Sequence, residues 1–100
     1  MRAEGENCNK VELDVYFYSI VADLVGERKT HWVVPAGTRL GDLIDRIADQ
    51  HPPFREFARQ TDVQAGSFLR LFRNGQMATD MNEIVADGDE IRIFPVISGG

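Results

Sequence analysis

The sequence has little of what metal sites and active sites require: among its 100 residues are a single cysteine, Cys8, and two histidines, His31 and His51. One cysteine cannot close an internal disulfide, and it cannot supply the several thiolates of a structural zinc site or an iron–sulfur cluster. The two histidines are far apart and belong to no Ser-His-Asp arrangement. We therefore expect no bound metal and no independent catalysis, and we interpret Cys8 as an incidental thiol.

The sequence also lacks a cluster of Lys and Arg, and its formal net charge is −5. This charge disfavours binding to nucleic acid or to an anionic membrane surface. No apolar run approaches membrane-spanning length, and the polar residues before Val11 do not have the apolar stretch of a secretion signal. We expect a cytoplasmic protein whose partners are other proteins.

A chain of 100 residues suffices for one domain with one core. Residues 1–9 are polar and without periodicity, so we expect a flexible N-terminal extension. The folded domain is expected over residues 10–95, followed by a flexible tail over residues 96–100 that ends in Gly-Gly. Function is expected to lie on the surface, because a domain of this size has little room for a deep enclosed site.

Two strands are predicted in the first third of the sequence. Apolar and polar residues alternate from Val11 to Tyr18, which is the period-two pattern of a half-buried strand. β-Branched and aromatic residues favour a second strand over residues 29–34, which Pro35-Ala36-Gly37 ends. The short connection between them indicates a hairpin.

A helix is predicted next, with Thr38 as its N-cap because a threonine hydroxyl can accept a hydrogen bond from a free backbone N–H. Its apolar residues recur at helical spacing and form one stripe: Leu40, Leu43, Ile44, Ile47 and Ala48. Pro52 and Pro53 end the helix. Residues 54–60 favour a short second helix, and residues 61–67 an irregular connection. The helix aspartates Asp42, Asp45 and Asp49 are expected to be a solvated surface without a ligand role.

The last third predicts three more strands. Residues 68–73 and 76–79 flank Asn74-Gly75, a strong hairpin signal. A turn at Asp87-Gly88-Asp89 precedes a final strand over residues 90–94, where Pro95 ends regular pairing. The order predicts an α+β fold in which a mixed sheet of four to five strands packs on one main helix.

This order, together with the ending from Asp87-Gly88-Asp89 through Phe94-Pro95 to Ser98-Gly99-Gly100, resembles the ubiquitin-like β-grasp sulfur carriers of the MoaD/ThiS family. The MoaD branch is the more similar, and three further stretches support the likeness: residues 15–18 leading to 24–26, residues 35–38 leading to 40–43, and residues 73–75. In one departure, Pro95 is followed by Val96, whereas that branch commonly has a second proline.

The resemblance implies that Gly100 is the reactive residue. A C-terminal carboxyl has an ordinary pKa of about 3.3–3.7 and is an ionised nucleophile near neutral pH. A partner adenylating enzyme of the MoeB/ThiF type would use ATP to form an acyl-adenylate on Gly100, which then becomes a thiocarboxylate. Gly99 would help the tail to thread into a narrow partner site, because glycine adds no side chain and accepts unusual backbone angles.

For a MoaD-like protein, the resemblance further implies the role of the non-catalytic small subunit of molybdopterin synthase, which donates sulfur during molybdenum or tungsten cofactor biosynthesis. The synthase large subunit, or another sulfur-accepting synthase, would then be the second partner. Three alternatives stay open: a carrier for thiamine, cysteine or tRNA thiolation; a ubiquitin-like modifier joined to lysines through Gly100; and a plain β-grasp binding domain with an inert tail.

Binding must come from the body of the domain, because a thin tail offers little apolar area. Outward residues of the expected strands include Tyr16, Phe72 and Phe94, and with Pro95 they predict an apolar patch that docks a partner. A small satellite core is the alternative for Tyr16 and Tyr18. We expect the patch to be flanked by Arg70, Arg73 and Arg92, which would steer an acidic partner surface.

Overall fold

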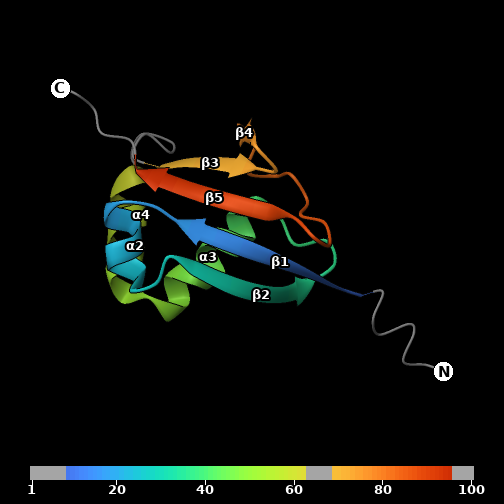
Figure 1. Ribbon diagram of the computed structural model, residues 1–100, viewed down its shortest axis with the longest axis horizontal. Coiled ribbons are helices and arrows are strands. Elements are labelled where there is room, and N and C mark those ends of the chain that lie inside the picture. The colour runs from blue at the N-terminus through green and yellow to red at the C-terminus, as the bar shows by residue number, and fades with distance from the viewer. Residues whose placement is uncertain (1–8, 63–68, 96–100) are drawn as a thin grey trace.

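The structure, a computed structural model, describes residues 9–62 and 69–95. Within these ranges a five-stranded sheet has the order β2-β1-β5-β3-β4, and the helices lie against one of its faces (Figure 1). The strands are β1 (Lys10–Phe17), β2 (Lys29–Pro35), β3 (Leu69–Arg73), β4 (Gln76–Ala78) and β5 (Glu90–Pro95). The helices are α2 (Ile20–Val25), α3 (Leu40–Gln50) and α4 (Pro52–Asp62).

The sheet is mixed, because its two central strands run parallel while the other pairs are antiparallel. Strand β1 pairs with β2 as the expected hairpin and with β5 in parallel. Strand β3 pairs antiparallel with both β5 and β4. The predicted α+β architecture is therefore confirmed. No helix of the described residues has the length and apolar character needed to cross a membrane.

The core lies between the sheet and the helices and is built by the expected alternation. Leu13, Val15 and Phe17 point from β1 into the core, and Ile91 and Ile93 do so from β5. The helical stripe also points inward: Leu40, Leu43 and Ile47 are fully buried, Ala48 is 8% exposed, and Ile44 packs against the cluster. The outward side chains of β1 and β5 are consequently left on an uncovered sheet face.

Helix α2 was not predicted, since the connection between β1 and β2 was expected to be only a short link. Its six residues are too few to display a periodic pattern, although Val21 and Val25 are buried one turn apart. The helix follows Ser19, which has a φ of 59°, and ends at Gly26, which has a φ of 88°. Glycine accepts this left-handed backbone without a steric penalty.

Thr38 is not the N-cap of α3, so that prediction was wrong. Its hydroxyl donates a 2.7 Å hydrogen bond to the carbonyl of Pro35, and its backbone carbonyl accepts from Val85 N. The helix begins at Leu40 after Arg39, whose N–H donates to a carboxylate oxygen of Asp42 at 3.3 Å. Threonine here closes the turn before the helix instead of capping it.

Helix α4 is longer than the second helix expected over residues 54–60. Pro52 and Pro53 do follow the end of α3, yet they also begin α4, because proline suits a first helical turn whose N–H groups have no intrahelical partner. Phe54 is fully buried and anchors this helix in the core. Two residues of the expected irregular connection, Thr61 and Asp62, are helical, and the remainder of it lies outside the described residues.

The predicted turns of the last third are confirmed. Asn74 and Gly75 both have positive φ, 53° and 86°, as a two-residue hairpin turn of type I′ requires. Gly88, in the second predicted turn, also has a φ of 86°. Pro95 is the last residue of β5 and is paired opposite Leu69, so pairing extends one residue beyond the expected strand.

Asp89 ties the start of β5 to the turn between β3 and β4. It is 5% exposed and accepts hydrogen bonds from Arg73 Nε at 2.8 Å, Asn74 Nδ2 at 2.9 Å and Ala86 N at 2.8 Å. Arg73 also contacts Glu83 at 3.2 Å. Arg73 therefore holds the fold together from the core side of the sheet and does not flank an exposed patch, which corrects the expectation for this residue.

Candidate functional site: an aromatic sheet face

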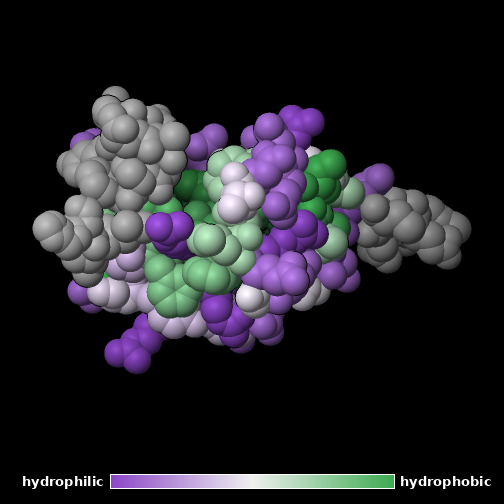
Figure 2. All heavy atoms as spheres, turned by 90° about the horizontal axis from the view of Figure 1, so that it is seen from above, coloured by the Kyte–Doolittle hydropathy of each residue, from purple (hydrophilic) through white to green (hydrophobic). Residues whose placement is uncertain are grey.

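The sheet face that the helices leave uncovered carries a cluster of aromatic side chains. Strand alternation and register place these outward residues together: Tyr16, Tyr18, Phe72, Arg92 and Phe94. Each of them is half-buried. We call the four aromatic residues of this set the aromatic face. Figure 2, which looks onto the molecule from the side of β3 and β4, shows hydrophobic residues exposed among hydrophilic ones.

Three rings of the aromatic face contact one another: those of Tyr18 just after β1, Phe94 on β5 and Phe72 on β3. Tyr18 stacks on Phe94 with ring centroids 4.2 Å apart and an angle of 9° between the planes. Phe72 meets Phe94 edge to face at 5.4 Å and 80°. Such pairs hold each other in place, so the cluster is a preformed surface. Tyr16 and Tyr18 therefore belong to this face, not to a satellite core.

Arg92 lies within this face. Its guanidinium carbon is 4.7 Å from the centre of the Tyr16 ring, and its Nε donates to the Tyr18 hydroxyl at 3.1 Å. Its Nη1 donates to Glu90 at 3.3 Å. Cation–π contact and hydrogen bonding together fix the direction of the side chain.

Two other predicted residues differ in their positions. Arg70 is on the uncovered face, opposite Phe94 in the register, and its Nη1 contacts the sulfur of Met77 at 3.4 Å. Pro95 follows Phe94 along β5, so the strand alternation turns it toward the other side of the sheet. The structure thus brings together Tyr16, Phe72 and Phe94 from the predicted patch and leaves Pro95 beside it.

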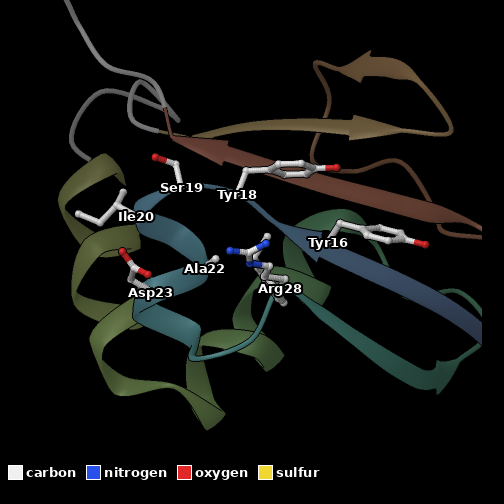
Figure 3. Close-up of a pocket in the computed structure, with 8 residues that line it drawn as sticks. Tyr16, Tyr18, Ser19, Ile20, Ala22, Asp23 and Arg28 are labelled. Carbon is white, nitrogen blue, oxygen red and sulfur yellow. The ribbon is translucent and has the colours of Figure 1, made fainter.

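An open hollow of about 660 Å³ borders the aromatic face where β1 ends. Figure 3 shows Ser19, Ile20 and Asp23 on its α2 side and the two tyrosines on its sheet side. Arg28 also lines the hollow, and its side chain makes no hydrogen bond or ion pair with any residue of the described ranges. Sequence reasoning missed this hollow, because it depends on the unpredicted helix α2.

The opposite end of the same face is acidic. His31 on β2 lies between two carboxylates of β1, with Nδ1 3.0 Å from Asp14 and Nε2 3.2 Å from Glu12. The hydrogen bond to Asp14 is the main cause that raises the pKa of His31 above its ordinary value. Among the residues that the structure describes, no group of three or more His, Cys, Asp or Glu side chains could hold a metal ion.

The predicted reactive residues, Gly99 and Gly100, lie outside the described residues. The structure does describe the residue that precedes the segment 96–100, namely Pro95 at the end of β5. Close to it, Tyr18 N donates to the carbonyl of Ile93 at 3.2 Å, and this hydrogen bond joins the residue after β1 to the last part of β5. The aromatic face therefore lies next to the end of the described chain at Pro95.

Comparison with models of known protein families identifies the family of this chain. Residues 15–100 match the model of the ThiS family, so the match runs from β1 through Gly100. The chain belongs to the ThiS family. Among its relatives is small archaeal modifier protein 1 of Haloferax volcanii, to which this ThiS-family chain is 29% identical over 83 residues. The aligned region covers 83% of this chain and 94% of the relative. It is 22% identical over 91 residues to the molybdopterin synthase sulfur carrier subunit of Mycobacterium tuberculosis, covering 90% and 99% of the two chains.

Solved structures confirm the ubiquitin-like β-grasp fold of this ThiS-family chain. The crystal structure of small archaeal modifier protein 1 from Haloferax volcanii has a TM-score of 0.77 at 27% identity, covering 89% of this chain and 99% of that one. A complex of subunits 1 and 2 of the molybdopterin-converting factor from Helicobacter pylori 26695 has a TM-score of 0.59 at 18% identity, covering 90% and 100%. The latter similarity concerns the fold.

Proposed function

We propose that this chain is a sulfur carrier that holds sulfur as a thiocarboxylate on Gly100 and donates it, as the small subunit of molybdopterin synthase, during molybdenum or tungsten cofactor biosynthesis. The observation that carries the proposal is the ThiS-family match, which extends through Gly99 and Gly100. The relative from Mycobacterium tuberculosis, a molybdopterin synthase sulfur carrier subunit, supports the choice of pathway. Such a protein works in the cytoplasm.

The chemistry needs no catalytic group on this chain. The carboxylate of Gly100 attacks the α-phosphorus of ATP held by a MoeB/ThiF-like adenylating enzyme, and pyrophosphate leaves. A sulfur nucleophile supplied by the partners then attacks the acyl carbon, and AMP leaves. The chain contributes a nucleophile that is ionised near neutral pH, since a terminal carboxyl has a pKa of about 3.3–3.7.

The domain supplies the binding surface and the tail supplies reach. Residues 96–100 follow Pro95, and five residues can extend by at most about 18 Å. A partner that reacts with Gly100 must therefore also cover the surface near the end of β5, where the aromatic face lies. We propose that this face docks the adenylating enzyme and, in turn, the sulfur-accepting synthase. The structure from Helicobacter pylori, a complex of subunits 1 and 2 of the molybdopterin-converting factor, supports a protein partner for this chain.

Intact-mass analysis of the protein from its native cell tests the proposed chemistry. We expect a population whose mass differs from the unmodified chain by the exchange of one carboxyl oxygen for sulfur, and we expect it to vanish when the gene for the adenylating enzyme is deleted. A protein that never carries this sulfur, even when the synthase is absent and cannot discharge it, would contradict the sulfur-carrier proposal.

A protein modifier is the second candidate, because the relative with 29% identity is a small archaeal modifier protein. Both functions begin with the same activated Gly100 and differ in the nucleophile that attacks it. A lysine amine would give an isopeptide bond to a target protein. Conjugates larger than the chain itself, found in the same mass analysis and lost together with the adenylating enzyme, would indicate the modifier function.

Replacing Phe94 with serine is expected to weaken docking of the adenylating enzyme by about 30-fold, since buried aromatic anchors at interfaces are worth about 2 kcal/mol. Phe94 is central because it touches both Tyr18 and Phe72. Titration calorimetry with the purified enzyme measures the change. Ile84→Ser, which alters an apolar side chain that is 52% exposed and lies outside the aromatic face, is the control. Equal binding by the Phe94 variant and the wild type would exclude this face.

A further inference from the structure

Arg92 is a charged residue within a surface that is otherwise aromatic. Tyr16 lies 4.7 Å from its guanidinium and is its register partner on β1, while Phe72 is its register partner on β3. Tyr18 accepts its Nε–H, and Tyr18 in turn stacks on Phe94. Any protein that covers the aromatic face must therefore also cover this positive charge.

The guanidinium is held firmly, yet part of it has no partner. A guanidinium has one N–H on Nε and two on each Nη. Nε donates to Tyr18, and one Nη1 hydrogen is directed to Glu90 at 3.3 Å. No acceptor for the other Nη hydrogens is found among the residues that the structure describes. The side chain is 32% exposed, so this free edge is accessible to a partner.

Docking changes the requirements of this free edge. In the free protein, water satisfies its N–H groups, but a partner that covers the face removes that water. A charge buried without a hydrogen-bonding counter-charge is costly, whereas a carboxylate can bind two N–H groups of one guanidinium at once. Glu90 does not fill this role, because it is 48% exposed and makes a single contact.

The charges around the aromatic face favour an acidic partner group. Arg70 lies opposite Phe94 in the register, and Lys29 Nζ is 5.4 Å from the Tyr16 ring. Arg70 and Lys29 lie beside the aromatic face although the chain as a whole has a net charge of −5, and Lys29 is also paired with Asp14 at 3.9 Å. Complementary charges at an interface select partners and fix their register.

We propose that Arg92 receives the carboxylate of an Asp or Glu side chain of the docked partner protein, and that it is the specificity-determining residue of the aromatic face. This inference rests on the proposed docking role of that face. It predicts an interface with apolar side chains over Phe72 and Phe94 and one carboxylate over Arg92. A basic partner group directed at Glu90 is the competing arrangement.

The test measures the Kd of the full chain for the purified MoeB/ThiF-like adenylating enzyme of the same organism. Arg92→Met should weaken binding by at least about tenfold, because it leaves the partner carboxylate unpaired. Arg92→Lys should retain only part of the wild-type affinity, since an ammonium cannot make the bidentate contact with a carboxylate. Glu90→Gln should tighten binding by removing the competing acid. Arg46→Met, at an exposed position of α3, is the matched control and should leave the Kd unchanged.

A charge exchange then identifies the partner group. Arg92→Glu should abolish docking, and one Asp→Arg or Glu→Arg change in the enzyme should restore it. Unchanged or tighter binding by Arg92→Met, or weaker binding by Glu90→Gln, would overturn the inference. Phe94→Ser distinguishes failure of the proposed docking face from failure of the carboxylate assignment. If this variant binds normally, the aromatic face is not the docking surface. If it binds weakly while Arg92→Met binds normally, only the carboxylate assignment fails. Thermal melts of each variant verify that it folds.

Discussion

Removal of Gly99 and Gly100 is expected to abolish activation by the adenylating enzyme while leaving the fold and the docking affinity intact. The carboxylate that must meet ATP is the last group of the chain, and removing two residues withdraws it by up to about 7 Å. A misplacement of even about 1 Å can reduce a positioned reaction by about 100-fold. Enzyme-dependent exchange of pyrophosphate into ATP measures the loss, which should exceed that factor.

Two further variants make this experiment specific. Adding one alanine after Gly100 keeps both glycines but moves the carboxylate, and it should be as inactive as the truncation. Deleting residues 1–8, which precede β1, should have no effect on exchange. Exchange by the truncated chain at the wild-type rate would refute the assignment of Gly100 and leave the β-grasp domain as a plain binding module.

Replacing Asp89 with asparagine is expected to lower the free energy of unfolding by about 3 kcal/mol, because it removes the buried carboxylate and leaves Arg73 with only the more exposed Glu83 as its counter-charge. Asp89 is 5% exposed and bonds to Arg73, Asn74 and Ala86, so its loss affects the β3–β4 turn, the loop before β5 and β5 itself. Urea denaturation followed by circular dichroism measures the change. Asp45→Asn, at an exposed position of α3, should be close to neutral.

The pH dependence provides an independent check on Asp89. Burial raises the pKa of this carboxyl, but hydrogen bonds from Ala86, Asn74 and Arg73 outweigh the burial, and the net pKa is below the ordinary aspartate value. A lowered pKa in the folded state means that Asp89 stabilises the fold above the unfolded pKa and loses this contribution as the pH falls through the folded pKa. The difference between wild type and Asp89→Asn should therefore shrink in acid. A constant difference would show that the charge of Asp89 is not what stabilises the fold.

Structural features that depend on neighbouring residues, such as strand orientation and tight turns, could be predicted from the sequence. The alternation around Val15 fixes which residues of β1 point inward, and the same rule places Ile91 and Ile93 in the core. Asn74 and Gly75 are residue types that accept positive φ, so their turn could be identified without tertiary information. Three residues of the aromatic face followed from the same alternation, since Tyr16, Phe72 and Phe94 occupy outward positions, whereas Tyr18 was not part of the predicted patch.

The remaining features depend on tertiary contacts that local patterns do not contain. Thr38 has a residue type suited to an N-cap, but its hydroxyl turns back to Pro35. Arg73 and Arg92 are both arginines and lie on neighbouring strands. Arg73 is opposite the core residue Ile91, whereas Arg92 is opposite Phe72 on the uncovered face. Alternation from Leu71 would have indicated the inward side for Arg73. Its counter-charge, Asp89, is distant in sequence and could not be assigned without the fold.

The position of β5 also bears on when this fold can form. Strand β5 is the last strand of the described residues, yet it lies between β1 and β3, and its pairing with β1 joins Glu90 to Asp14. Before β5 has been synthesised, the chain can form only two separate hairpins, each with an edge that lacks its partner. Pairings between such distant residues are slow to form, and unpaired edges invite aggregation. Sheet closure therefore has to wait for β5, the last strand of the described residues to be synthesised.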